Sequence, residues 1–167
     1  VDKPSGEIID CPVSDAMAHS QIRILSSEVI QKQKSLEEED IIVVAGRGVR
    51  SENGVRLCQE LADVLGGQLA FTRPMVEDGF GDTAHQIGLS GRTVRPKLII
   101  TCGVSGAIQF TSCMNGSEYI VAINTDPEAR IFKTANYCLV EDLYQVVPKL
   151  TEMLKKRKED DEDGVSL

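Results

Sequence analysis

Two glycine-rich turns in this sequence follow short apolar runs and have the composition of anion-binding loops. The first reads Gly-Arg-Gly at 46–48, after the β-branched run at 41–45. The second reads Gly-Val-Ser-Gly-Ala at 103–107, after the apolar run at 97–102. Glycine lets the backbone approach a phosphate, and free amide groups at a helix start attract negative charge. Alone, the first turn fits equally well a tight turn with a surface arginine. The second fits equally well a serine that caps a helix.

A third group of polar residues occurs in the long segment between 72 and 95. Its residues 86–91 read Gln-Ile-Gly-Leu-Ser-Gly. Loops of this length in compact domains are usually functional or disordered, and the glycines and polar side chains favour function. Two further features, the turn at 124–127 and Asp142, are by themselves ordinary turn chemistry and a favourable charge at a helix N-terminus.

The elements that must position these residues alternate between strand and helix patterns. Strands are predicted at 41–45, 68–71, 97–102, 119–123 and 138–140, and helices at 51–65, 105–113 and 141–156. This alternation predicts an α/β fold with a mostly parallel sheet. Such sheets bind ligands at the carboxyl ends of their strands, which is where the glycine-rich turns fall.

Composition argues against several classes of function. The chain has 18 Lys and Arg against 26 Asp and Glu, a net charge of −8, so nucleic acid is not an expected partner. Its only histidines, His19 and His85, support neither a metal site nor a hydrolase triad. No apolar run approaches the ~18 residues of a membrane span. Five cysteines without a C-x-x-C pair indicate a reducing compartment, and Cys102 and Cys138 are expected in the core.

The chain is expected to hold one main domain with two extensions. Residues 1–39 contain two short apolar stretches, at 7–9 and 22–25, which are interpreted as trailing strands and a linker from a missing N-terminal domain. Residues 40–157 form the predicted domain, and residues 158–167 an acidic disordered tail. The first residue is valine rather than methionine, so the chain looks cut from a longer polypeptide.

Taken in order, these motifs closely resemble the C-terminal FAD-binding domain of the electron transfer flavoprotein alpha subunit. The resemblance covers about 40–156 and rests on Thr72-Arg73, on Gln-x-Gly-x-Ser-Gly at 86–91, on Gly-Val-Ser-Gly-Ala-Ile-Gln at 103–109 and on the run at 121–132. It implies a three-layer Rossmann-like fold of the DHS-like NAD/FAD-binding type that holds one FAD non-covalently. It also implies an electron carrier rather than an enzyme that turns over a substrate.

The partners that the resemblance implies are redox proteins. They are an electron transfer flavoprotein beta subunit, a flavin dehydrogenase as donor, such as an acyl-CoA dehydrogenase, and a quinone-reducing or other redox acceptor. The bacterial cytoplasm is favoured as the location, with the mitochondrial matrix as the alternative. Two other functions stay open: a non-redox module that binds adenine nucleotide, and the alpha subunit of an electron-bifurcating flavoprotein.

The same resemblance implies a set of cofactor-binding residues. Arg47 would face the pyrophosphate, and Thr72 and Arg73 would lie close to the isoalloxazine ring. A guanidinium there favours the negatively charged reduced forms of a flavin, whereas the alternative for Arg73 is a surface ion pair. The rest of the set would surround the flavin and ribityl chain, and its last two members would fall at the adenosine and ribityl end. These residues are Gln86, Gly88, Ser90, Gly91, Gly103, Val104, Ser105, Gly106, Ala107, Gln109, Asn124 and Asp142.

Two residues depart from the family's usual pattern. Phe110 stands where the family commonly has histidine, so a potential cation near the pyrimidine edge of the flavin is missing. This difference is expected to lower the potential of the first one-electron step. Leu89 replaces the more usual glutamine, which removes one polar contact and predicts weaker cofactor binding or a different partner.

Overall fold

The structure is a computed structural model that describes residues 6, 9–12, 25–27 and 35–163. The chain divides into two compact units, Val1–Lys32 and Gln33–Leu167. Every helix and strand described below lies in the second unit. The trailing strands predicted at 7–9 and 22–25 lie outside the described residues, except for Ile9 and Leu25, which are both exposed.

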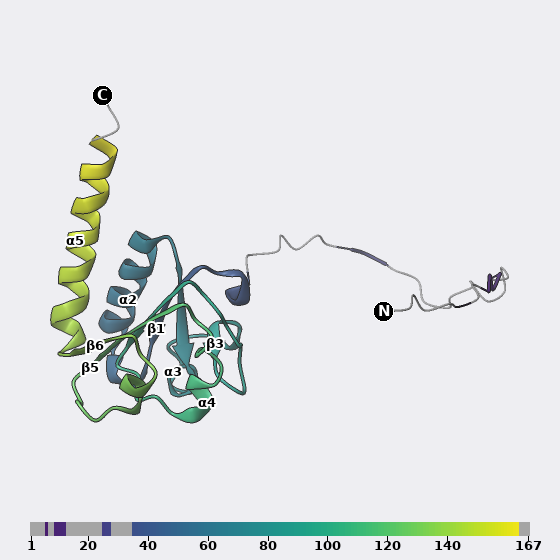
Figure 1. Ribbon diagram of the computed structural model, residues 1–167, viewed down its shortest axis with the longest axis horizontal. Helices are drawn as coiled ribbons and strands as arrows, with labels where there is room; N and C mark the ends of the chain where they lie inside the picture. Colours follow the sequence, from purple (N-terminus) through teal and green to yellow (C-terminus); the bar gives the residue numbers. More distant parts are fainter. Residues whose placement is uncertain (1–5, 7–8, 13–24, 28–34, 164–167) are drawn as a thin grey trace. The chain divides into compact units, whose positions relative to one another are not determined.

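The second unit is built on a six-stranded sheet in which all neighbouring strands pair in parallel (Figure 1). Its strands are β1 (Ile41–Ala45), β2 (Gln68–Thr72), β3 (Gln86–Ile87), β4 (Leu98–Cys102), β5 (Tyr119–Asn124) and β6 (Tyr137–Val140). The spatial order is β3-β2-β1-β4-β5-β6, which reverses between β1 and β4. A ligand-binding crevice opens at the carboxyl ends of the strands at such a reversal. The predicted α/β class with a parallel sheet is confirmed.

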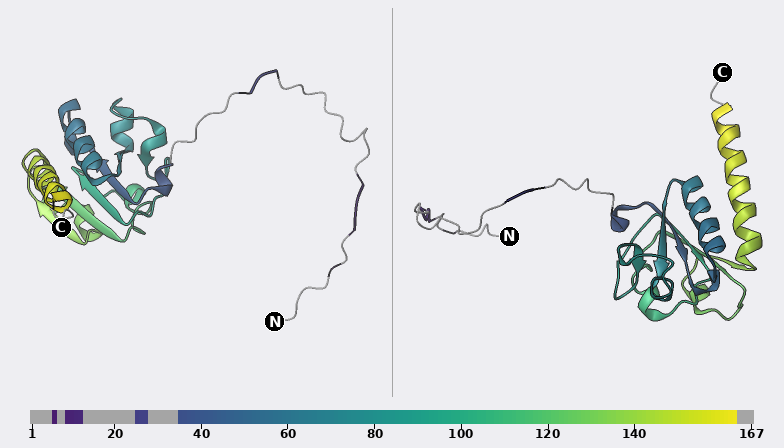
Figure 2. Two further views of the ribbon diagram at one scale, coloured as in Figure 1. Left: turned by 90° about the horizontal axis from the view of Figure 1, so that it is seen from above. Right: turned by 180° about the vertical axis from the view of Figure 1, so that it is seen from behind.

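The two long helices, α2 (Glu52–Leu65) and α5 (Leu143–Asp163), pack side by side on one face of the sheet (Figure 2). The Ser51 side chain caps α2 by accepting a hydrogen bond from the Gly54 amide, and Gly66 ends it in the left-handed conformation. The short elements are α3 (Arg73–Glu77), α4 (Ile108–Thr111) and the 3-10 turns η1 (Leu36–Glu38), η2 (Arg47–Val49), η3 (Thr83–His85) and η4 (Arg130–Lys133). Within the described ranges, no helix is long and apolar enough to cross a membrane.

Side chains of the central strands alternate between two apolar cores, one on each face of the sheet. On one face, Val43 packs with Leu61 of α2 and Val147 of α5. On the other, Val44 belongs to the cluster that contains Phe110 of α4. The sheet is therefore the middle of three layers, as predicted. Because β1 is covered on both faces, its side chains form a continuous apolar run rather than an alternating one.

The segment after β4 differs from its prediction. The sequence predicts a helix over 105–113 capped by Ser105, but α4 is confined to Ile108–Thr111 and Ala107 is its N-cap. Gly106 has a φ of 84°, in the left-handed region, so the chain at 105–107 cannot be helical. The Ser105 carbonyl instead accepts a hydrogen bond from the Ile131 amide at 3.2 Å. The glycine-rich turn thus packs against the segment that follows β5.

Helix α5 is longer than predicted. The acidic segment expected to form a disordered tail from 158 is helical as far as Asp163, and residues 164–167 lie outside the described ranges. The basic run at 155–158 precedes the acidic run at 159–163. Lysine, arginine and glutamate favour helix, and opposite charges three or four residues apart stabilise it. Lys156 and Glu152 form such a pair, with 2.7 Å between Nζ and Oε1.

The two cysteines expected in the core have different environments. Cys102, at the end of β4, is buried, and a hydrogen bond with the Cys58 thiol together with burial raises the pKa of Cys102. It is therefore a neutral thiol beneath the turn at 103–107. Cys138 is exposed, so the prediction of a core position is wrong. The reason is that β6 is the last strand of the sheet, where the neighbouring Tyr137 is also exposed.

Candidate functional site

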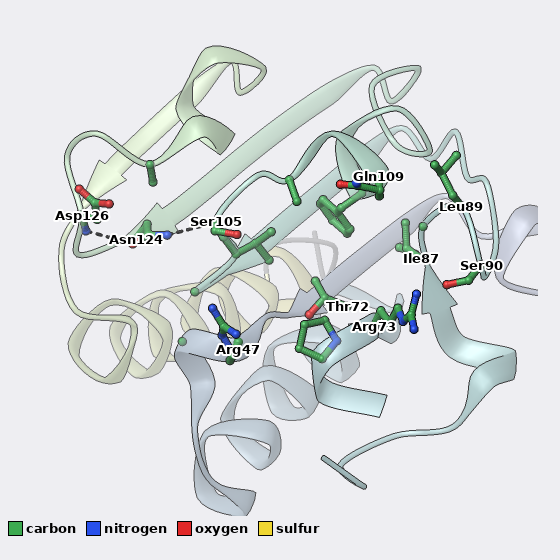
Figure 3. Close-up of a pocket in the computed structure, with 18 of the residues that line it drawn as sticks. Arg47, Thr72, Arg73, Ile87, Leu89, Ser90, Ser105, Gln109, Asn124 and Asp126 are labelled. Carbon is green, nitrogen blue, oxygen red and sulfur yellow. Dashed lines mark hydrogen bonds between the residues drawn. The ribbon is translucent and has the colours of Figure 1, made fainter. Parts of the chain in front are cut away.

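A pocket of about 890 Å³ lies at the carboxyl ends of β1, β2, β4 and β5, on both sides of the point where the strand order reverses (Figure 3). This volume lies within the usual range of ligand and cofactor sites. The residues that line it are Arg47, Gly48, Arg50, Thr72, Arg73, Pro74, Ile87, Gly88, Leu89, Ser90, Gly103, Val104, Ser105, Ala107, Gln109, Phe110, Asn124, Asp126 and Ala129. In Figure 3, Asn124 and Asp126 lie at one end of the pocket and Leu89 and Ser90 at the other.

The two glycine-rich turns are in direct backbone contact. The Gly46 amide donates to the Cys102 carbonyl at 2.9 Å, and the Gly48 amide donates to the Gly103 carbonyl at 2.9 Å. A Cβ atom at Gly48 would lie 2.8 Å from the Gly103 Cα, which is closer than real contacts allow. These glycines therefore bring the turns after β1 and β4 together, and the pocket is formed beside their contact.

Positive charge predominates among the side chains of the pocket. Arg47, Arg50 and Arg73 line it, whereas Asp126 is the one carboxylate among the lining residues. Within the described part of the chain, neither Arg47 nor Arg50 has a carboxylate within ion-pair distance. Anionic groups such as phosphates are the ligands that unpaired guanidinium groups bind most strongly. Arg50 was not among the predicted residues, although a second cation three residues after Arg47 was a visible signal.

Arg73 forms a surface ion pair and also lines the pocket. Its Nε lies 2.7 Å from an Oε1 of Glu77, four residues later in α3, so it does form an ion pair. The two side chains are 66% and 58% exposed, and an exposed pair of this kind contributes little stability. The guanidinium nevertheless lines the pocket beside Thr72. The pair therefore holds the cation at the pocket wall without burying it.

Gln86 does not line the pocket, but it contacts a residue that does. Its side chain is 4% exposed, and its Nε2 donates to the Ser90 Oγ at 2.9 Å. Gly91 is also absent from the lining, and a Cβ there would lie 2.2 Å from the Gln86 carbonyl oxygen, so its backbone packs directly on Gln86. Gln86 and Gly91 thus shape the loop, whereas Gly88 and Ser90 of the same motif reach the pocket.

Gly106 and Asp142 are the other predicted residues that the structure leaves outside the lining. A Cβ atom at Gly106 would lie 2.2 Å from the Ile131 amide nitrogen, so this glycine is required by packing. Asp142 lies just before α5, where its Oδ1 accepts a hydrogen bond from the Tyr144 amide at 3.0 Å. Its carboxylate therefore caps the helix rather than facing the pocket.

Asn124 ties together the turns after β4 and β5. Its Nδ2 donates to the Val104 carbonyl at 2.8 Å, and its Oδ1 accepts from the Asp126 amide at 3.0 Å (Figure 3). Asp126 was interpreted from the sequence only as turn chemistry, but the structure places it in the pocket lining. Its position two residues after Asn124, at the same sheet edge, was the signal that could have identified it.

Thr72 carries a buried polar atom without a partner. The residue is 7% exposed, and its Oγ1 is the only buried side-chain nitrogen or oxygen in the described part of the chain that forms no hydrogen bond. Such a group costs free energy unless a ligand satisfies it. Because Thr72 lines the pocket next to Arg73, the hydroxyl is available to a bound polar group. No three potential metal ligands come together among the described side chains.

The parallel sheet, the reversal between β1 and β4 and the cationic pocket at that point define a Rossmann-like nucleotide-binding domain. Residues 35–115 match a family model described as "Electron transfer flavoprotein FAD-binding domain". The chain therefore belongs to the electron transfer flavoprotein alpha-subunit family and represents the FAD-binding domain of that family.

Curated relatives extend the similarity beyond the matched segment. The electron transfer flavoprotein subunit alpha of Thermoanaerobacterium thermosaccharolyticum is 44% identical over 159 residues, which cover 94% of this chain and 48% of that protein. The Bacillus subtilis subunit of the same name is 46% identical over 153 residues, or 90% of this chain and 45% of that protein. The lactate dehydrogenase (NAD(+),ferredoxin) subunit LctC of Acetobacterium woodii is 45% identical over 157 residues, or 93% and 37%. The chain thus spans less than half the length of these relatives.

Proposed function

We propose that this domain binds one FAD and, as part of an alpha subunit paired with a beta subunit, carries electrons between redox proteins. The donor would be a flavin dehydrogenase, such as an acyl-CoA dehydrogenase, and the acceptor a quinone-reducing or other redox protein. Bound FAD supplies the ability to exchange one or two electrons. The observation that carries the proposal is the pocket at the strand-order reversal, which three arginine residues line together with a buried hydroxyl that lacks a partner in the described part of the chain.

The residues have distinct roles in this proposal. Arg47 and Arg50 bind the pyrophosphate, because they are the pocket cations with no carboxylate partner in the described part of the chain. Arg73 and the hydroxyls of Thr72 and Ser90 lie toward the ring. A cation beside the ring favours its negatively charged reduced forms, which makes Arg73 a determinant of reduction potential rather than of substrate turnover.

The proposal of a carrier, rather than an enzyme with its own substrate, rests on this family membership. A second candidate within the family is a subunit of a complex that divides electrons between two acceptors, and the similarity to the Acetobacterium woodii subunit favours it. A non-redox module for adenine nucleotide is a third. We place the protein in a bacterial cytoplasm, in keeping with its bacterial relatives, with the mitochondrial matrix as the alternative.

Flavin retention tests the proposal directly. The purified chain is mixed with FAD and desalted, and its absorption spectrum is recorded with and without an electron transfer flavoprotein beta subunit, beside a parallel binding test with ADP. Retained bands near ~450 nm are expected, and they should weaken in Arg73→Ala because an arginine at the ring has been removed. Tight retention of ADP without flavin, in the presence of the beta subunit, would instead identify a nucleotide-binding module.

Arg56→Ala is the matched control for Arg73→Ala. Arg56 also pairs with the glutamate four residues later in its helix, at 3.8 Å, and its side chain is 71% exposed, against 66% for Arg73. Arg56 does not line the pocket. Equal flavin loss in the two variants would therefore contradict a specific role for Arg73.

The unpartnered hydroxyl of Thr72 provides a second test, with effects of opposite sign. Thr72→Val keeps the shape of the side chain and removes a buried polar atom that forms no hydrogen bond. Without ligand, the free energy of unfolding should stay unchanged or rise by up to about 1 kcal/mol. The dissociation constant for FAD should rise about tenfold, because a ligand group then loses its partner. Urea unfolding and fluorescence titration measure the two effects, and unchanged FAD affinity would show that the hydroxyl is not used.

A further inference from the structure

A chain of hydrogen bonds links α5 to the first glycine-rich turn, outside the pocket. The Gly54 amide donates to the Ser51 Oγ at 3.1 Å, and the Ser51 Oγ lies 2.8 Å from the Tyr144 hydroxyl. The Tyr144 hydroxyl in turn donates to the Val49 carbonyl. Every hydroxyl in this series can therefore donate once and accept once, in one direction. The series ends on the peptide group that joins Val49 to Arg50.

That peptide group precedes the one residue other than glycine that has a positive φ in the described part of the chain. Arg50 has a φ of 58° and a ψ of −4°, the left-handed conformation that side chains with a Cβ rarely adopt. Such conformations persist where surrounding contacts determine them, and they occur often at ligand-binding sites. Rotation of the Val49–Arg50 peptide would change the φ of Arg50. The hydrogen bond from Tyr144 opposes this rotation.

The rest of the turn is held from the other side. The Gly48 amide bonds to the Gly103 carbonyl at 2.9 Å, and the Val49 amide bonds to the Gly46 carbonyl at 2.9 Å. These bonds hold the turn up to the Val49 nitrogen and leave the Val49 carbonyl to Tyr144. Gly54 gives the phenol its room, because a Cβ there would lie 2.7 Å from the Tyr144 hydroxyl oxygen.

We infer that Tyr144 is a positioning residue for Arg50, one of the two pocket arginines proposed to bind an anionic group. Its hydroxyl holds the Val49–Arg50 peptide so that Arg50 stays left-handed and remains among the residues that line the pocket. Asp142 takes part indirectly, because it caps the amide of Tyr144 at the start of α5. This inference rests on the proposed function in one respect, which is that the anion is the pyrophosphate of FAD.

A double-mutant cycle with Arg50 tests whether Tyr144 acts through it. Tyr144→Phe should raise the dissociation constant for FAD about tenfold, because Arg50 is no longer held in place. In the Arg50→Gln background the same substitution should change that constant less than twofold. A residue with a purely structural role would cause the same loss in both backgrounds. Equal losses, or no loss from Tyr144→Phe alone, would overturn the inference.

Hydrogen exchange of the ligand-free protein gives a readout that is independent of FAD. Tyr144→Phe should speed exchange of the amides at 46–51, whereas Tyr137→Phe should not. Tyr137 is the matched control because its side chain is 58% exposed and its hydroxyl has no hydrogen-bond partner in the described part of the chain. If the wild type binds no FAD, the proposed function fails, and the exchange rates alone decide the inference. Unchanged exchange at 46–51 would then overturn it.

Discussion

Gly106→Ala is expected to lower the free energy of unfolding by about 3–5 kcal/mol. A Cβ atom at this position would lie 2.2 Å from the Ile131 nitrogen and 2.6 Å from the Ile131 Cα, both of which are backbone atoms that cannot turn away. The φ of 84° adds the cost of a left-handed alanine. Relief of the overlap requires the turn at 103–107 to separate from the segment after β5. Urea unfolding of the ligand-free protein measures the loss.

Gly79→Ala separates the two contributions to this loss. Gly79 has nearly the same φ, 81°, but nothing lies within 4 Å of a Cβ built on it. It should therefore lose only the left-handed cost of about 1 kcal/mol. Because Gly106 lies between Ser105 and Ala107, both in the lining, Gly106→Ala should also weaken FAD binding, and Gly79→Ala should not. Similar losses of stability in the two variants would mean that the contact with Ile131 does not determine the turn.

Phe110→His is expected to raise the first one-electron potential of the FAD-loaded protein by on the order of 50–100 mV. Phe110 is 6% exposed and lines the pocket, so a histidine there would place a cation where the present chain has an apolar ring. A unit positive charge within about 6 Å of a negatively charged flavin, at an effective dielectric constant of about 20, stabilises that reduced form by about 3 kcal/mol. For a one-electron step, a free-energy difference of about 1.4 kcal/mol corresponds to a change in potential of about 59 mV. Partial protonation of the histidine reduces the full effect. Potentiometric titration measures both one-electron potentials.

Phe110→Leu and a change of pH isolate the charge in this prediction. Leucine stays apolar, so it should shift the potentials little while it removes the same aromatic packing. Histidine loses its charge as the pH rises through its pKa, and burial moves that pKa below its usual value near ~6.5. The shift should therefore be larger at pH ~5.5 than at pH ~8. If neither potential differs from that of Phe110→Leu at the lower pH, the missing cation does not set the potential.

Local sequence signals predicted most of the framework that surrounds the pocket. The run at 41–45 is apolar and β-branched because β1 is covered on both faces, and this pattern indicates a buried parallel strand without reference to the rest of the chain. Ser51 and Gly66 mark the two ends of α2 through bonds within a few residues of themselves. Eleven of the 15 residues assigned from the family resemblance line the pocket. The reason is that the carboxyl ends of parallel strands lie at the same edge of the sheet, so motifs that follow these strands come close together.

The remaining features depend on contacts between distant segments, which local patterns do not encode. Glycine at 106 is compatible with a helix N-terminus until the Ile131 backbone is placed against it. Gln86 is buried with its amide on Ser90, and so it shapes the pocket without lining it.

The amino-acid sequence by itself determined five of the six strands, all except β3, together with the turn chemistry and the family. Only the tertiary structure decided which of those residues meet. Arg50 lines the pocket from a turn that meets two distant segments: β4 lies beside β1, and the Tyr144 hydroxyl, 95 positions along the chain from Val49, bonds to the Val49 carbonyl. The physical reason is that capping and periodicity act over a few residues, whereas close approach of backbones and buried hydrogen bonds require the folded sheet to bring distant segments together.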